Sequence, residues 1–359
     1  MKKLNKTFVQ NAITYALVIA AFIIMTVLMN AGMLTRSMKG QLVPICVYIV
    51  MAVSLNLTVG ISGELSLGHA GFMSVGAFSG AVAAACLADV VPDPTLRLVL
   101  AMLVGGVLAA VAGVIIGIPV LRLRGDYLAI VTLAFGEIIR NVINCLYVAL
   151  DNGKLRFAFN APLAQDLEGI MAGTPFQVII NGPQGATISG KLATFTMGFA
   201  LVMVSLIVVL NLINSRSGRA IMAIRDNRIA AESVGISATK YKMMAFVISA
   251  TLAGMAGALY SMNYSSVTAS KFKFDTSILV LVFVVLGGIG NIRGSVIAAA
   301  LLTVLPELLR AFNDYRMLIY AIVLILVMLV SNNPRINQFT VSLMEKIKGK
   351  KAEEGGAQG

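Results

Sequence analysis

The chain has 359 residues, of which 58% are hydrophobic and only 12% are charged, and its formal net charge is +12. Soluble domains carry about 25% charged residues, so this composition excludes an ordinary soluble protein and predicts a polytopic α-helical protein embedded in membrane lipid. The continuous apolar runs differ from the alternating segments of a transmembrane β-barrel. No polar domain remains that could use the positive charge on nucleic acid, so we expect no nucleic-acid partner.

Apolar segments that approach the length of a membrane span, about 20 residues, follow one another along the chain. About ten are expected, at residues 11–32, 42–60, 68–88, 98–119, 127–150, 192–213, 243–264, 276–290, 292–311 and 315–331. An even number places both termini on one side, and basic clusters near both ends and at residues 122–124 and 214–242 predict that this side is the cytoplasm. We therefore expect one all-α transmembrane domain over residues 1–335 and a cytoplasmic C-terminal tail at 336–359.

Two segments are rich in glycine, residues 60–71 between the second and third spans and residues 287–294 between the eighth and ninth. Glycine-interrupted apolar segments in both halves of a chain are typical of broken helices that line a transport path, because unwound backbone is tolerated only where protein or water satisfies it. The alternative is a pair of tight interhelical turns in which glycine supplies a positive φ. The candidate helix breaks are Gly63, Gly68, Gly287, Gly288 and Gly290.

Ionisable residues inside the predicted spans are candidates for function, because a charge near the bilayer centre costs at least about 2.5 to 3.5 kcal/mol. Glu137 and Arg140 are three residues apart in the fifth span, so they share a helix face and can pair, for a functional or a purely structural reason. Glu64 is a candidate for contact with a polar group in transit. His69 is the only histidine, which excludes metal sites with several imidazoles, and a lone histidine is more often a packing residue than a proton carrier.

The longest connection, residues 151–191, is predicted to be external and irregular, because it contains three prolines and the turn signal Asn181-Gly182-Pro183-Gln184-Gly185. Its segment Gly185 to Leu192 resembles a phosphate-binding loop but lacks the final hydroxyl residue and lies on the wrong side for cytosolic nucleotide. No other catalytic constellation is present. We expect a protein that is not an enzyme and needs no cofactor.

The segment Asn214 to Lys242 is strongly basic, with six Arg and Lys residues against Asp226 and Glu232 as its acids. Its pattern predicts a helix over residues 225–234, a break at Gly235 and a second helix that continues into the span from Met243. A polar helical segment between membrane spans indicates a partner outside the membrane. The alternative is a solvated basic loop that only fixes the topology.

This segment resembles the coupling loop of ABC-importer permeases, whose pattern is Glu-Ala-Ala, three residues and Gly. Ala230, Ala231 and Gly235 match the spacing, Ile229 occupies the Glu position, and the nearest acid is Glu232. The residues that the resemblance assigns to ATPase coupling are Arg225, Asp226, Arg228, Ala230, Ala231, Glu232 and Gly235.

Further motifs occur in the order seen in LivM-type permeases of branched-chain amino acid ABC importers. They are Ser54-Leu-Asn56-Leu, Gly63-Glu-Leu-Ser66-Leu-Gly-His69-Ala-Gly71-Phe, Gly125-Asp126-Tyr127, Arg225-Asp226-Asn227 and Gly287-Gly288-Ile-Gly290. The resemblance implies a permease subunit in the bacterial cell membrane. It also implies a sister LivH-type permease, two cytoplasmic ATPases that hydrolyse ATP, and an extracytoplasmic binding protein that delivers leucine, isoleucine or valine.

A path for such solutes should be mostly apolar with a few polar groups, for which Asn56, Glu64, Ser66, His69 and Glu137 are the candidates. A permease for urea or short amides from the same superfamily is an alternative, because the motifs do not separate these substrates. A secondary transporter that works alone is a second alternative, and it would leave residues 214–242 without a role.

Overall fold

The computed structural model describes residues 6–123, 125–151, 154–159, 176–188, 190–310, 315 and 318–325. The chain forms two compact units, residues 1–303 and residues 304–359. In the second unit the described residues comprise the end of one helix, where Arg310 pairs with Glu307 at 3.3 Å, and a helical stretch at 318–325. The features below belong to the first unit unless stated otherwise.

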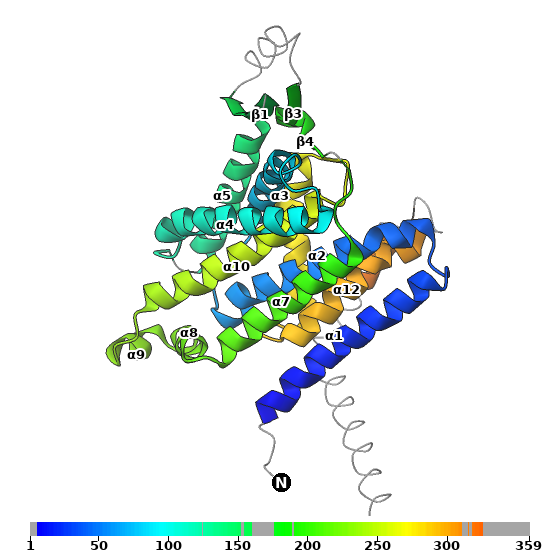
Figure 1. The fold of residues 1–359 in the computed structure, drawn as a ribbon. Helices are drawn as coiled ribbons and strands as arrows, with labels where there is room; N and C mark the ends of the chain where they lie inside the picture. Colours follow the sequence, from blue (N-terminus) through cyan, green and yellow to red (C-terminus); the bar gives the residue numbers. More distant parts are fainter. Residues whose placement is uncertain are drawn as a thin grey trace, which may run out of the picture. The chain divides into compact units, whose positions relative to one another are not determined.

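Long helices make up most of the described chain (Figure 1). They are α1 (Lys6–Asn30), α2 (Arg36–Asn56), α3 (His69–Cys86), α4 (Pro94–Val120), α5 (Asp126–Asn144), α7 (Phe195–Asn214), α10 (Ala238–Ser261), α11 (Phe274–Gly287) and α12 (Ile292–Leu308). A π-helical turn, η1 (Leu57–Ile61), continues α2. Within the described residues, six helices are long and apolar enough to cross a membrane, and α11 is a shorter apolar helix. The prediction of a polytopic helical membrane protein is confirmed, and the count of ten spans is approximate.

The sequence accounts for where several helices begin. The side chain of Thr35 accepts a hydrogen bond from the Met38 N–H at the start of α2, and Asp93 caps α4, whose first residue is Pro94. A hydroxyl or carboxylate at this position satisfies a backbone N–H that has no partner within the helix, and proline lacks that N–H altogether. Turn residues between the apolar runs therefore set the helix boundaries.

Helix α10 is the centre of the packing and contacts α2, α3 and α4. Glycines bring the backbones together: a Cβ atom on Gly76 of α3 would lie 2.0 Å from the Gly254 carbonyl oxygen of α10, and one on Gly257 would lie 1.9 Å from the Met73 oxygen. In lipid, where apolar side chains gain little by leaving the solvent, such close contact is a main source of helix association. The outer face of α4 is exposed and apolar, for example at Val107 and Ile115.

The structure corrects the prediction for the segment that follows α5. The helix ends at Asn144, short of the predicted residue 150, and the chain continues as β1 (Leu146–Asp151) and β2 (Lys154–Phe159). Farther on lie β3 (Phe176–Asn181), the 3₁₀ turn η2 (Gly182–Gln184), β4 (Ala186–Thr187), β5 (Ser266–Val267) and the 3₁₀ turn η3 (Ala269–Phe272). The strands form one antiparallel sheet in the order β2-β1-β3-β4-β5. The described part of the predicted irregular loop is therefore largely sheet.

The sequence contains a signal for this hairpin. Asp151 pairs with Lys154, so β1 and β2 are joined by the two residues Asn152 and Gly153, which lie outside the described residues. Asn-Gly is the favoured dipeptide for such a loop, and Leu146 to Leu150 has the aromatic and β-branched residues of a strand. The prediction of irregular structure gave more weight to the prolines of the connection than to this strand pattern.

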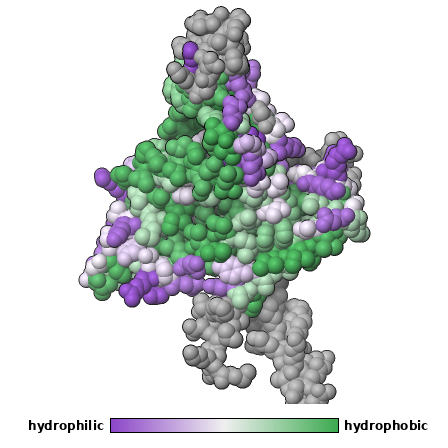
Figure 2. All heavy atoms as spheres, in the orientation of Figure 1, coloured by the Kyte–Doolittle hydropathy of each residue, from purple (hydrophilic) through white to green (hydrophobic). Residues whose placement is uncertain are grey.

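The loops sort into two groups. The predicted external segments meet in the sheet, because Ala186 pairs with Val267, and the predicted cytoplasmic segments meet around α8 (Arg216–Asp226) and α9 (Arg228–Ser233). Figure 1 shows the strands and these two short helices at opposite ends of the first unit. Figure 2 shows hydrophobic side chains over the middle of the face in view and hydrophilic ones along its lower edge. The arrangement agrees with the predicted sorting of loops.

Candidate functional site

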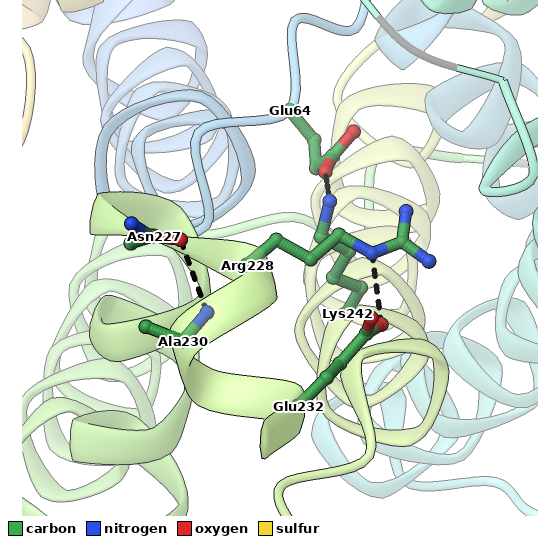
Figure 3. Close-up of polar contacts among 6 residues, drawn as sticks. All are labelled: Glu64, Asn227, Arg228, Ala230, Glu232 and Lys242. Atoms are coloured by element: carbon green, nitrogen blue, oxygen red, sulfur yellow. Dashed lines mark hydrogen bonds and ion pairs between the residues drawn. The ribbon is translucent and has the colours of Figure 1, made fainter. Parts of the chain in front are cut away.

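The basic segment, residues 214–242, folds as two short helices before Gly235 rather than the predicted single helix. Ser215 begins α8 by accepting a hydrogen bond from the Gly218 N–H at 3.1 Å. Asn227 has extended backbone, ends α8, and caps α9 by accepting from the Ala230 N–H at 3.1 Å (Figure 3). Asparagine is a preferred N-cap residue, so this additional break has a sequence signal that the prediction overlooked.

The predicted break at Gly235 lies where α9 ends and the chain turns towards α10. Gly235 has a φ of +85°, and a Cβ atom there would meet no atom within 4 Å. A small apolar cluster of Ile224, Ala231 and Ala238 holds the turn against α10. On the outer side, Ile229 is 82% exposed and Val234 is 75% exposed. The segment is thus anchored on one face and presents apolar side chains on the other.

Two of the predicted coupling residues pair within α9. Arg228 Nε lies 2.9 Å from Glu232 Oε1, one helical turn away, and both side chains are partly exposed. Such a pair contributes about 0.3 to 0.5 kcal/mol to the stability of a helix. Glu232 therefore has a local partner, and Figure 3 shows this pair beside the contact of Lys242 with Glu64.

The first glycine-rich segment interrupts the path from α2 to α3. The π-helical turn η1 is followed by non-helical residues 62–68, and Gly63 has a φ of +75°. The basic segment 214–242 contacts this interruption at two points. Arg225 Nη1 donates a hydrogen bond to the Gly60 carbonyl oxygen at 2.8 Å, and Lys242 forms an ion pair with Glu64.

The second glycine-rich segment lies against the first. Helix α11 ends at Gly287, and Gly288 and Gly290 have φ values of +91° and +83° before α12 begins. The Gly290 N–H donates to Asn56 Oδ1 at 2.8 Å, and Asn56 Nδ2 donates to Ser295 Oγ at the same distance. Asn56 thus joins the end of α2 to both sides of the second interruption.

Glycine is required where the two interruptions touch. A Cβ atom on Gly60 would lie 1.9 Å from Asn56 Oδ1 and 2.3 Å from the Gly290 nitrogen. Real Cβ atoms do not approach other atoms this closely, so a side chain at residue 60 would push the segments apart. We call the group formed by Asn56, Gly60, Glu64, Arg225, Lys242, Gly290 and Ser295 the glycine junction.

The structure does not place Ser66 and His69 in the glycine junction. Ser66 is buried, and among the described residues its hydroxyl has no hydrogen-bond partner, as is also true of Ser62. His69 is buried, and its Nε2 lies 2.8 Å from the Ser54 hydroxyl. Because that hydroxyl donates its proton to the Met51 carbonyl oxygen, His69 Nε2 is the donor. His69 therefore has the surroundings of a packing residue.

Gly68 and Glu137 connect neighbouring helices. A Cβ atom on Gly68 would lie 2.1 Å from the Thr132 carbonyl oxygen, so glycine here lets the start of α3 approach α5. Glu137 pairs with Arg140 at 2.7 Å, as the spacing predicted, and also accepts a hydrogen bond from the Phe274 N–H at 3.3 Å. A carboxylate at the N-terminal end of a helix stabilises its unpaired N–H groups, which gives Glu137 a structural partner in α11.

A groove of about 650 Å³ lies among α3, α4, α5 and strands β1 to β3. Its walls are almost entirely apolar, with side chains such as Phe78, Ile139 and Phe157. None of the predicted path residues lines it. No group of three or more His, Cys, Asp or Glu side chains with metal-binding geometry occurs among the residues that the structure describes.

Residues that the sequence analysis missed complete the glycine junction. Lys242 was assigned only to the end of the basic segment, and Ser295 was assigned no role, yet each binds a predicted residue. Lys242 could have been suspected, because it is the last charge before a membrane span. Ser295 carries no signal of its own, since its partner lies 239 positions away in the sequence.

Comparison with known proteins places this geometry in a family context. A family model described as branched-chain amino acid transport system / permease component matches residues 37–328. The LivM permease protein of the high-affinity branched-chain amino acid transport system of Escherichia coli (strain K12) is 36% identical over 294 residues, which cover 79% of this chain and 66% of that protein. The LivM protein of Salmonella typhimurium gives the same values.

A more distant relative is the LivH permease protein of Salmonella typhimurium, which is 33% identical over 118 residues covering 32% of this chain and 38% of that protein. The chain spans just under two thirds of the length of the LivM proteins that it matches. No solved structure gives a significant match.

Proposed function

Because the chain belongs to the permease components of branched-chain amino acid transport systems, we propose that it is a transmembrane subunit of an ATP-driven importer for leucine, isoleucine and valine. The chain itself would not hydrolyse ATP. It would lie in the bacterial cell membrane with both termini in the cytoplasm, as the distribution of Lys and Arg predicts.

The observation that carries this proposal is the direct contact of a polar segment with the first helix interruption, which in turn lies against the second. Residues 214–242 run from the end of α7 into the start of α10, and Arg225 and Lys242 contact Gly60 of η1 and Glu64 of the non-helical residues that follow it. A basic loop that only fixed the topology would need no such contacts. A stand-alone transporter would leave the exposed Ile229 and Val234 without a partner.

The proposed partner at this surface is a pair of cytoplasmic ATPases. The small side chain of Ala230 and the turn at Gly235 would let α9 enter a groove, where the exposed Ile229 and Val234 would be buried. Asp226, Arg228 and Glu232 would lie at the rim, where charge complementarity directs association, whereas Arg225 would face the membrane domain, where it donates to the Gly60 carbonyl oxygen. Ala231 would not touch the ATPase itself. It would support α9 from the side that faces α10, because it is buried against Ile224 and Ala238.

The other partners follow from the family. A LivH-type permease would form the second half of the transmembrane part, and an extracytoplasmic binding protein would deliver the solute at the end of the molecule that carries the sheet. The domain at residues 1–335, its external loop at 151–191 and the tail at 336–359 keep the roles that the sequence predicted. Binding of ATP would close the ATPases and rock the helices so that the path opens to one side at a time.

The path is proposed to pass the helix interruptions. A branched-chain amino acid has an apolar side chain and a charged backbone, so it needs few polar contacts in a mostly apolar passage. Asn56, Glu64 and the buried hydroxyl of Ser66 are the proposed polar contacts. We assign His69 and Glu137 to helix packing, because each lies in a helix and bonds to a residue outside the two interruptions, Ser54 and Phe274 respectively. Gly63, Gly68, Gly287, Gly288 and Gly290 would provide the bends.

Reconstitution of the complete complex in liposomes tests the proposal. Wild-type complex should take up labelled leucine in an ATP-dependent manner and should not take up urea. Replacing Gly235 by leucine meets no atom within 4 Å of the Cβ position but strains a backbone with a φ of +85°. Because this turn lies between α9 and α10, outside the predicted spans, membrane insertion should remain intact, but uptake and substrate-stimulated ATP hydrolysis should be abolished. Full coupling in this variant, or uptake by the chain without ATPases, would contradict the proposal. Uptake of urea instead of leucine would reassign the substrate.

A further inference from the structure

The Arg225 side chain spans the distance between the cytoplasmic helices and the membrane-embedded interruption. Arg225 lies in the last turn of α8, next to the Asn227 cap that separates α8 from α9. Its Nη1 donates to the Gly60 carbonyl oxygen at 2.8 Å, while Nε and Nη2 donate to Asp226 Oδ1 at 3.2 and 3.1 Å. Because a guanidinium group is planar and rigid, the contact with Asp226 fixes the direction in which Nη1 points.

The Gly60 carbonyl oxygen is available because η1 departs from α-helical pairing. In an α-helix this oxygen would accept from the residue-64 N–H, but the Glu64 N–H donates to the Thr58 oxygen at 2.9 Å instead. The end of a helix carries partial negative charge on such carbonyl groups, so a cation is favoured there. Arg225 supplies the donor that the interruption removes.

Gly60 also connects the two interruptions. It has no side chain, and its backbone lies directly against Asn56 and the Gly290 nitrogen, which are themselves hydrogen-bonded. Displacement of the Gly60 backbone therefore has to displace Gly290 as well, or break the bond between Gly290 and Asn56. Lys242 and Glu64 form a second link on the other side of Gly63, and their side chains are only 15% and 11% exposed.

We infer that Arg225 is a positioning residue through which movement of α8 and α9 reaches both helix interruptions by way of the Gly60 carbonyl. The inference rests on the proposed function, because it requires an ATPase that moves these helices. Arg225 would transmit movement from α8 and α9 to the interruptions, and this role differs from docking of the ATPase. Docking would use the outer face of α9, whereas Arg225 contacts the membrane domain.

The test uses the complete reconstituted complex and matched substitutions in α8. Arg225→Gln removes the charge and the reach, and Arg225→Lys keeps a cation without the planar fork. Arg219→Gln is the control, because Arg219 is exposed on the same helix and donates only to the nearby Asn214 carbonyl oxygen at 3.2 Å among its described contacts. The measurements are complex assembly, basal ATP hydrolysis, its stimulation by loaded binding protein, and uptake of leucine.

For Arg225→Gln we expect the complex to assemble and to keep its basal ATP hydrolysis. Stimulation of ATP hydrolysis by the loaded binding protein should be lost, and leucine uptake should fall about tenfold or more, because a hydrogen bond of a charged group is lost. Arg225→Lys should be intermediate and Arg219→Gln should match wild type. Unchanged stimulation in Arg225→Gln, or an equal loss in Arg219→Gln, would overturn the inference while wild-type uptake still supports the proposed function. If the complex with Arg225→Gln does not assemble, Arg225→Lys provides the test. Stimulation of ATP hydrolysis to the wild-type level in Arg225→Lys would then overturn the inference. Absence of ATP-dependent uptake by the wild-type complex would instead reject the proposed function.

Discussion

Glycine brings backbones together in two regions of this molecule, and the two regions differ in what surrounds the contact. Between α3 and α10, Gly76 and Gly257 lie against regular helix, so close packing is the whole interaction. At the glycine junction, Gly60 and Gly290 lie where helices end, and side chains such as Asn56 and Arg225 satisfy the freed backbone groups. The first region is held by contacts of backbone with backbone, and the second by hydrogen bonds of side chains with backbone. We therefore expect the second region, rather than the first, to change conformation during transport.

The largest effect is expected from a side chain in the packed region. Replacing Gly76 by valine would place an atom 2.0 Å from the Gly254 oxygen, with backbone on both sides and no side chain that could move away. Overpacking of this kind costs about 1 to 3 kcal/mol or more, so folded protein should be nearly absent from the membrane. The amount of monodisperse protein in detergent measures this.

Gly40→Ala is the control for the packed region, because this residue is also helical and has no atom within 4 Å of the Cβ position. It should be neutral or slightly stabilising, since alanine favours a helix by about 1 kcal/mol over glycine. Normal levels of Gly76→Val would contradict the assignment of this region to rigid packing.

A smaller effect on folding and a larger one on transport are expected at the glycine junction. Replacing Gly60 by alanine would force Asn56 to turn and would separate Gly60 from the Gly290 nitrogen. The protein should still insert, because Asn56 presents a side chain and Gly290 lies in a non-helical turn, which can shift more readily than two packed helices. Uptake should fall about tenfold through the lost hydrogen bonds. Uptake equal to that of Gly40→Ala would show that contact between the interruptions is dispensable.

The smallest effect is expected at the ion pair of Glu64 with Lys242. Neutralising either residue to glutamine leaves a poorly exposed charge without its partner, whereas the double variant removes both charges. Each single variant should therefore unfold more easily than the double variant, with a coupling energy of about 1 to 3 kcal/mol, between those of surface and buried pairs. Thermal unfolding in detergent of the wild type, the two single variants and the double variant gives this coupling energy. If the losses of stability in the two single variants add up to the loss in the double variant, the ion pair does not stabilise the glycine junction.

Part of this architecture follows from the sequence alone, because membrane spans are set by local composition. The apolar runs predicted most helices, and positive φ values at Gly63, Gly288 and Gly290 agree with their place outside regular helix. The sheet was missed, because the prolines of the connection at residues 151–191 outweighed the strand pattern beginning at Leu146. Local sequence pattern alone does not decide between irregular structure and a sheet for this connection.

The glycine junction itself could not be predicted from local pattern. The motifs singled out Asn56 and Gly290, but the bond between them joins residues 234 positions apart, and the contact of Arg225 with Gly60 joins residues 165 apart. Whether Arg225 faces a partner protein or its own membrane domain depends on how α8 folds back against η1 and α10. That in turn depends on the caps at Ser215 and Asn227, which end the preceding helices.

The central claim is that α8 and the two interruptions move together when ATP binds. Spin labels at residues 219 and 289, both on exposed positions, report the distance between them in the reconstituted complex after the native cysteines are replaced. The account predicts that this distance is the same with and without ATP, while the distance from residue 289 to a label at exposed residue 187 in the sheet changes. A change between 219 and 289 on binding of ATP, with the distance from 289 to 187 constant, would contradict it.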